Sequence, residues 1–279
     1  MLHRPIVALA LAASTVAFAA CGGSEDPAPA SAPKAADPRL SAAVTGYHGY
    51  VVTQARELHD RTARFVAAVK AGDVAAARRL FAAAREPWEK IEPVAESFGA
   101  LDPEIDARVN DVAAGDRWTG FHRIERALWK DGSTRGMGPI ADKLLADVTR
   151  LQGKVRRATY EPEQLAIGAT ELLAEVSATK ISGEEDRYSH ADLWDIAANV
   201  AGAQAAFDLL APALRSRDAA LAQTVTARFA AVRRALRATQ TGGRYPRYDT
   251  VGQAQRRRLS QLVDALAEPL SQVAGRLRS

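Results

Sequence analysis

The 279-residue sequence contains a single cysteine, Cys21, so no disulfide can form within the chain. After its first twenty residues it also lacks any uninterrupted apolar stretch of the roughly 20 residues that a membrane-spanning helix needs. Alternation of β-branched and polar residues, which is typical of strands, is nearly absent. These absences argue against a disulfide-rich scaffold, an integral membrane protein and a β-sheet fold, and they predict a soluble mature domain.

The start of the chain predicts export. A basic segment precedes an apolar run over residues 6–13, and small residues end at Ala20, directly before Cys21. This order is typical of a signal peptide, here over residues 1–20. Residues 18–21, Phe-Ala-Ala-Cys, resemble a bacterial lipobox and predict a lipid on Cys21; the alternative is an ordinary secretory signal with an unmodified cysteine at the cleavage site.

Residues 21–39 predict a disordered linker, because they contain four prolines and no large apolar side chain. At about 3.1 Å per residue in polyproline II, this linker could hold a domain up to about 50 Å from the lipid anchor. We therefore expect the protein to be anchored at the outer face of the cytoplasmic membrane, or to lie in the periplasm. The formal charge of +4 comes from interspersed acids and bases, which does not suggest a nucleic-acid surface.

Residues 40–279 predict an all-α domain. Alanine, leucine, arginine and glutamate dominate, and the apolar residues recur at helical spacing. Short connections favour antiparallel neighbours, so we expect an antiparallel helix bundle, or two four-helix bundles packed together. The expected helices cover residues 40–70, 73–98, 117–130, 138–157, 161–181, 190–215, 218–240 and 250–277.

A first motif with chemical potential contains His122 and Glu125. These residues are three positions apart and therefore share one helix face, which Trp118 and Trp129 continue. A buried carboxylate must be paired, protonated or bound to a metal. The pair is therefore either a set of metal ligands or a structural His–Glu pair beside a neighbouring arginine.

A second motif contains Glu89 and Glu92, which also share a helix face. Pro87 and Pro93 flank them and should kink or end the helix. Two carboxylates this close repel each other, and a bound cation would remove that cost. The alternative is a solvated acidic face balanced by Arg85 and Lys90.

A third motif covers residues 182–194. Ser189 and Asp192 are expected to cap a helix. Residues 184–186 form an acidic approach to it, and His190 either joins a site or lies at the surface. All four tryptophans fall within the three motifs, which suggests a site between helices.

Together these segments resemble the signature segments of the imelysin-like domain in the EfeO/EfeM family of bacterial iron uptake components. The matching stretches read PWEKIEPVAESFG, DPEIDAR, TGFHRIERALW and GEEDRYSHADLWD. The resemblance implies helix bundles and a metal site centred on His122 and Glu125, with Glu89, Glu92 and Asp106 as further ligands. Longer family members begin with a cupredoxin domain, where this sequence has only a linker, so any iron oxidation is expected to occur elsewhere.

The resemblance further implies that Fe³⁺ is bound as cargo, with an iron permease and a haem peroxidase as partners. Carboxylates suit Fe³⁺, and the histidine admits Zn²⁺ or Mn²⁺ as surrogates. We expect a cleft lined by Trp88, Trp118 and Trp129, and an affinity that falls below about pH 6, where histidine protonates.

Two other functions stay open. The first is a zinc metallopeptidase that uses the HxxE motif, although neither HExxH nor HxxEH occurs and Arg126 stands where the second histidine of the latter would be. The second is a surface protein that binds anionic polysaccharide through its arginines. Binding without catalysis is the expected activity.

Overall fold

The computed structural model describes residues 37–278. The predicted signal peptide, Cys21 and most of the predicted linker lie outside these residues. Helices dominate the described part of the chain, and no strand occurs within it, so the predicted all-α class is confirmed. The α-helices are α1 (Pro38–Lys70), α2 (Val74–Ile91), α3 (Leu101–Asp106), α4 (Gly120–Trp129), α5 (Gly138–Val155), α6 (Pro162–Ala178), α7 (Asp192–Arg215), α8 (Ala219–Thr239), α9 (Gln253–Ser271) and α10 (Val273–Arg278), and the short 3-10 helices are η1 (Glu92–Phe98), η2 (Lys180–Ser182) and η3 (Tyr248–Thr250).

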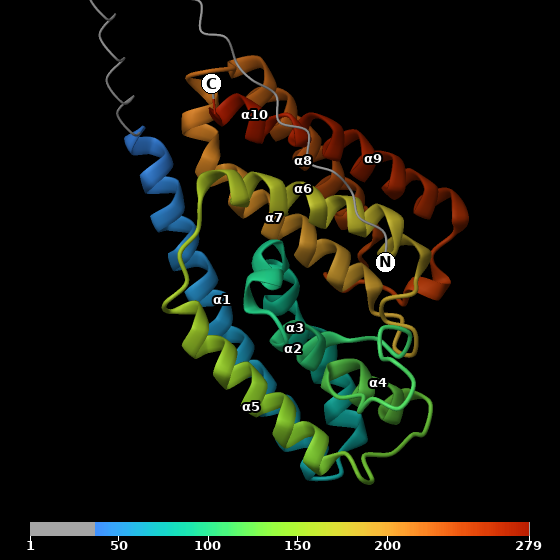
Figure 1. Cartoon of the computed structure of the whole chain (residues 1–279). Coiled ribbons are helices and arrows are strands. Elements are labelled where there is room, and N and C mark those ends of the chain that lie inside the picture. Colours follow the sequence, from blue (N-terminus) through green and yellow to red (C-terminus); the bar gives the residue numbers. More distant parts are fainter. Residues whose placement is uncertain (1–36, 279) are drawn as a thin grey trace, which may run out of the picture. The chain divides into compact units, whose positions relative to one another are not determined.

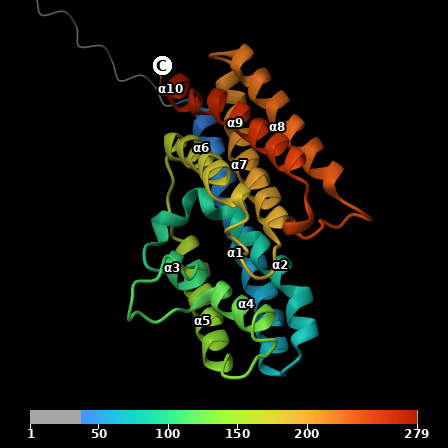
Figure 2. The same cartoon turned by 90° about the vertical axis from the view of Figure 1, so that its right-hand side faces the viewer.

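The helices form two bundles that pack against each other (Figure 1). In the first, α1 packs on α2 and α5, and the short α4 packs between α2 and α5. In the second, α6 packs on α7 and α9, and α8 closes the ring between them. The bundles meet where α7 packs on α1 and α2, and where α6 packs on η1. Figure 2 shows α6 to α10 together at one end and α2 to α5 at the other.

The helix α1 begins two residues earlier than the sequence predicted. Asp37 caps it, accepting a hydrogen bond from the Arg39 amide at 2.9 Å, and Pro38 occupies the first turn, where proline costs no hydrogen bond. With 33 residues, α1 is about 50 Å long. It therefore contacts helices of both bundles.

The prolines of the second motif shape the end of α2. Pro87 lies inside the helix, and the helix ends at Ile91, just before Pro93, where η1 takes over. Each proline removes the amide that would bond to the carbonyl four residues earlier. Arg61 donates to the Ala83 carbonyl at 3.1 Å instead, and Asn199 donates to the Glu89 carbonyl at 3.0 Å.

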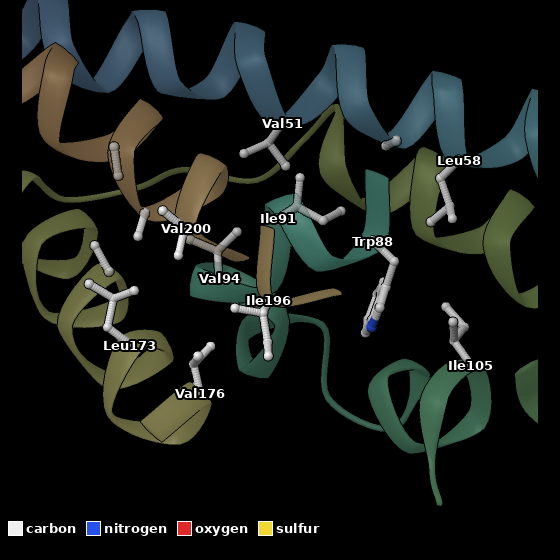
Figure 3. Close-up of a cluster of buried hydrophobic side chains, with 14 of the residues drawn as sticks. Val51, Leu58, Trp88, Ile91, Val94, Ile105, Leu173, Val176, Ile196 and Val200 are labelled. Carbon is white, nitrogen blue, oxygen red and sulfur yellow. The ribbon is translucent and has the colours of Figure 1, made fainter. Parts of the chain in front are cut away.

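A continuous apolar core joins the two bundles (Figure 3). Ile91 from α2 lies between Val51 of α1 on one side and Ile196 of α7 on the other, and Trp88 of the same helix lies beside them. All four side chains are fully buried. The core thus holds α2 in a fixed position between α1 and α7.

The contact between α2 and α7 requires Gly202. A Cβ atom at this position would lie 2.3 Å from the Lys90 carbonyl oxygen. We expect Gly202→Ala to lower the free energy of unfolding by about 1–3 kcal/mol in a urea titration. In Gly153→Ala, the added methyl group meets no atom within 4 Å, so a gain of up to about 1 kcal/mol is expected. Equal changes in both variants would contradict a close approach at Gly202.

None of the helices in residues 37–278 is both long enough and apolar enough to cross a bilayer.

Candidate metal centre

The residues of the three sequence motifs meet where the two bundles join. The first bundle contributes Arg85 and Glu89 from α2, Asp106 from the end of α3, and His122 and Glu125 from α4. The second contributes η2 and the segment that leads into α7, which carries Glu185 and Asp186. A polar site therefore lies between two well-packed bundles.

His122 is the centre of this site. Its ring is 1% exposed, and its Nδ1 lies 2.8 Å from the Glu125 carboxylate. Its Nε2 is buried without a hydrogen-bond partner in the described residues, and it lies 3.6 Å from Asp106 and 3.8 Å from Glu185. His122, Asp106 and Glu185 each offer one ligand atom, and these three atoms lie close enough together to bind one metal ion. His122, Glu125 and Asp186 form a second set of this kind. The first set uses the free ring nitrogen.

Glu125 fixes the orientation of the His122 ring. One of its oxygens faces His122, and the other accepts hydrogen bonds from the backbone amides of Tyr188 at 3.0 Å and Ser189 at 2.7 Å. Burial favours the neutral acid, but the hydrogen bonds from His122 and the two amides outweigh it and lower the pKa of Glu125. Glu125 therefore stays ionised and leaves Nε2 as the position at which His122 can bind a metal.

In the metal-free state, His122 holds a proton strongly. Burial and the neighbouring guanidinium of Arg85 lower the pKa of His122, but the carboxylates of Glu125, Glu185 and Asp106 outweigh both and raise it to about 10. A metal ion must therefore displace a proton from this ring.

Arg85 neutralises the carboxylates behind the histidine. It is fully buried, and its guanidinium binds Glu89 and Asp195 at 2.6 Å, Asp186 at 2.9 Å and Asp106 at 3.1 Å. These acids come from both bundles. The fork of donors on an arginine suits such a crowded arrangement, which a single ammonium group could not satisfy.

Lys180 takes the position of a cation between Glu89 and Glu92. Its ammonium group is fully buried and lies 2.9 Å from both carboxylates. Asn199 adds hydrogen bonds to the same two carboxylates at 3.0 and 2.6 Å. The repulsion that the sequence predicted between the two glutamates is thus relieved by a side chain of the protein itself.

An acidic cleft of about 380 Å³ leads from the surface to Asp106 and Glu185. Its lining includes seven carboxylates and one arginine, Arg108, whose guanidinium lies 3.0 Å from Glu185. A cation entering the cleft therefore meets a strongly negative surface before it reaches the His122 group. The acidic lining residues are Glu92, Asp102, Asp106, Asp111, Glu171, Glu175 and Glu185.

The structure brings together three of the five predicted ligands, His122, Glu125 and Asp106. Glu89 and Glu92 lie in the same network, but Lys180 occupies the space between them. The tryptophan-lined cleft was a wrong expectation. Trp88 belongs to the core, Trp129 packs on Phe81, and none of the tryptophans lines the acidic cleft in the described part of the chain.

Sequence reasoning missed several groups of this site. Glu185 was read only as part of an acidic approach, Arg85 as part of a solvated face, and Lys180 had no role. The spacing of Arg85 and Glu89 at i and i+4 did signal a pair. Nothing local distinguishes Lys180 from a solvated lysine near the end of a helix. The prediction that Ser189 caps α7 is wrong, since Ala191 takes the cap position and the Ser189 hydroxyl makes no hydrogen bond in the described residues, whereas Asp192 lies in the first turn of the helix as expected.

The fold and this site describe an all-helical protein of two bundles with a buried histidine–carboxylate group at their junction. A family model described as Imelysin, which carries the label Peptidase M75, matches residues 43–273. This chain belongs to the imelysin family, as its motifs predicted.

Relatives within this family are strongly similar. The iron uptake system component EfeM of Pseudomonas syringae pv. syringae (strain B728a) is 46% identical over 239 residues, which cover 84% of each chain. The iron uptake system component EfeO is 43% identical in Escherichia coli (strain K12) and 44% identical in Escherichia coli O157:H7, over 85% of this chain and 64% of EfeO. The chain thus spans slightly less than two thirds of the length of the EfeO relatives.

Proposed function

We propose that this chain binds ferric iron outside the cytoplasm and supplies it to an iron uptake system. The observation that carries the proposal is the buried, unpartnered Nε2 of His122, which faces Asp106 and Glu185 at the inner end of an acidic cleft. Carboxylate oxygens suit a hard cation such as Fe³⁺, and the imidazole extends the choice to Zn²⁺ or Mn²⁺. The names of the EfeM and EfeO relatives support iron as the cargo.

In this proposal, His122, Asp106 and Glu185 are the ligands, and Glu125 orients the histidine. A carboxylate behind a metal-binding histidine is the usual arrangement in proteins, because it fixes the ring and increases its basicity. Glu89 and Glu92 are not ligands in this proposal. They form ion pairs with Lys180 and Arg85, and these two cations hold the buried acids around His122 together.

The site geometry disfavours the two alternative functions. A peptidase would need a carboxylate free to act as a base, whereas both oxygens of Glu125 are engaged by His122 and two backbone amides. The carboxylates of the cleft would repel an anionic polysaccharide, so such a ligand would have to bind at another surface of the protein.

A titration of Fe³⁺, supplied as a soluble chelate, tests the proposal. We expect the double variant His122→Ala with Glu125→Ala to bind at least tenfold more weakly than the wild type, because it loses one ligand and the group that orients it. His59→Ala with Asp60→Ala removes a comparable pair from the surface of α1 and should bind like the wild type. Equal affinity in all three proteins would place the iron site elsewhere. Peptide cleavage that is lost in the first variant would favour the peptidase.

The proposal also includes a lipid on Cys21 and, as partners, a permease and a haem peroxidase of the same uptake system. The lipobox-like residues before Cys21 and the naming of the relatives as components of a system support it. Cys21→Ser is expected to move the protein from the membrane fraction to the soluble fraction. A variant that stays bound to the membrane would contradict this anchor.

A further inference from the structure

A second pocket has the opposite charge to the metal cleft. It measures about 350 Å³, and no carboxylate lines it in residues 37–278. Four arginines and two aromatic rings surround it. The pocket, called the arginine pocket below, is lined by Arg78, Arg79, Ala82, Ala83, Ser189, His190, Ala191, Trp194, Arg244, Tyr245, Pro246 and Arg247.

Two of the arginines are available to a ligand. Arg78 donates to the Leu128 carbonyl, and Arg247 pairs with Asp249 at 2.7 Å. Arg79 and Arg244 form no ion pair with any described residue, and both are exposed. They approach the pocket from α2 and from the connection between α8 and η3. An anion that binds both would join parts of the two bundles.

The walls of the pocket are preformed. The rings of Trp194 and Tyr245 meet edge to face at 5.5 Å. His190 has a φ of 58°, which is uncommon for a residue other than glycine. Its amide donates to the Asp186 carbonyl at 2.7 Å and its carbonyl accepts from the Tyr248 amide at 2.8 Å. These bonds hold the uncommon backbone conformation of His190 in place.

A buried polar group at the pocket wall has no partner. Ser189 is 5% exposed and lines the pocket, yet its hydroxyl forms no hydrogen bond to any described residue. Leaving a buried hydroxyl unsatisfied costs about 1–3 kcal/mol. The hydroxyl oxygen itself has almost no accessible surface, so it would donate to a ligand oxygen once the Ser189 side chain turns toward the pocket.

We propose that the arginine pocket binds a small anion that carries two or more carboxylate or phosphate groups. Arg79 and Arg244 bind the oxyanion groups, since guanidinium forks match the geometry of both. The Ser189 hydroxyl donates to one oxygen, and the volume suits a molecule of small-metabolite size. The site lies outside the metal cleft and does not depend on iron binding.

The test is a calorimetric titration of the full chain with tricarballylate and, separately, with pyrophosphate, in about 0.15 M salt, where weak surface attraction is screened. We expect at least one probe to bind the wild type and to lose at least tenfold in affinity in the double variant Arg79→Glu with Arg244→Glu. Arg233→Glu with Arg234→Glu reverses the same number of exposed charges on α8 and should bind like the wild type. Ser189→Ala, which changes no charge, should weaken binding several-fold.

The two probes distinguish the source of the oxyanion groups. Preferential binding of tricarballylate assigns the site to carboxylates, and preferential binding of pyrophosphate assigns it to phosphates. Failure of both probes to bind the wild type overturns the proposal. Equal losses in the two double variants also overturn it, because they would show attraction by overall charge. Circular dichroism of each variant confirms that it is folded.

Discussion

Replacing Arg85 with methionine is expected to lower the free energy of unfolding at pH 7 by about 3–5 kcal/mol. Methionine fills much of the same volume but leaves the surrounding buried carboxylates without their shared cation. These carboxylates belong to Glu89, Asp106, Asp186 and Asp195. Urea unfolding followed by circular dichroism measures the change. The loss should shrink as the pH falls, because Glu89, whose pKa is lowered against the effect of burial by Lys180 and Arg85, then becomes neutral and no longer needs a counter-charge.

A surface arginine provides the matched control. Arg247 pairs with Asp249, but its side chain is 55% exposed. Arg247→Met should therefore change the free energy of unfolding by less than about 1 kcal/mol. A loss of similar size in both variants, or none in Arg85→Met, would show that the buried network does not hold the bundles together.

The affinity for a divalent surrogate such as Zn²⁺ is expected to rise about tenfold per pH unit, or about 1000-fold from pH 6 to pH 9. The carboxylates around His122 raise its pKa to about 10, so over this range the metal must displace one proton for each ion bound. This shift moves the pH dependence well above the value of about 6 that an ordinary histidine predicts. A competition titration with a chromophoric chelator measures the affinity, and calorimetry in buffers of different ionisation enthalpy counts the proton.

Glu125→Gln is the informative variant for this pH dependence. It removes a charge that stabilises protonated His122, so the rise in affinity should level off at lower pH than in the wild type. A wild-type affinity that is constant above about pH 7 would contradict the raised pKa.

The same pKa shift affects the metal-free fold. Because the folded state binds this proton more tightly than the unfolded chain, the stabilising contribution is complete below about pH 6.5. It is lost as the pH rises towards about 10. Metal-free protein should therefore lose stability over this range.

Much of the fold follows from local sequence signals. Helical spacing located the long helices, because each buries one apolar stripe, and most of their bounds agree within a few residues. The exceptions are the ends of α2 and α9, which were expected at residues 98 and 277 but lie at Ile91 and Ser271. The helix α3 was missed, since six residues are too few to show a period. A kink or an end was expected at both prolines: α2 ends just before Pro93, although the helix was expected to continue to residue 98, whereas Pro87 is tolerated because Arg61 satisfies the carbonyl that it frees.

The site was predictable only in part. His122 and Glu125 share a helix face, so spacing alone placed them together. Their partners Glu185 and Asp186 lie more than 50 residues away along the chain, and only the packing of the second bundle on the first brings them close. Likewise, no local pattern shows that Lys180 is buried 2.9 Å from Glu89 rather than solvated.

The hydrogen bonds of Arg85 also determine how the chain can be divided. The connection between α5 and α6 separates two complete four-helix rings, so the topology suggests two domains that could fold alone. Yet Arg85 belongs to the first ring and Asp195, at 2.6 Å from it, to the second. Separation of the rings would break the ion pairs between Arg85 in one ring and the buried carboxylates in the other. Each half would then hold buried charges that lack some of their partners. We therefore expect the two rings to unfold in one cooperative transition, as a single thermodynamic unit.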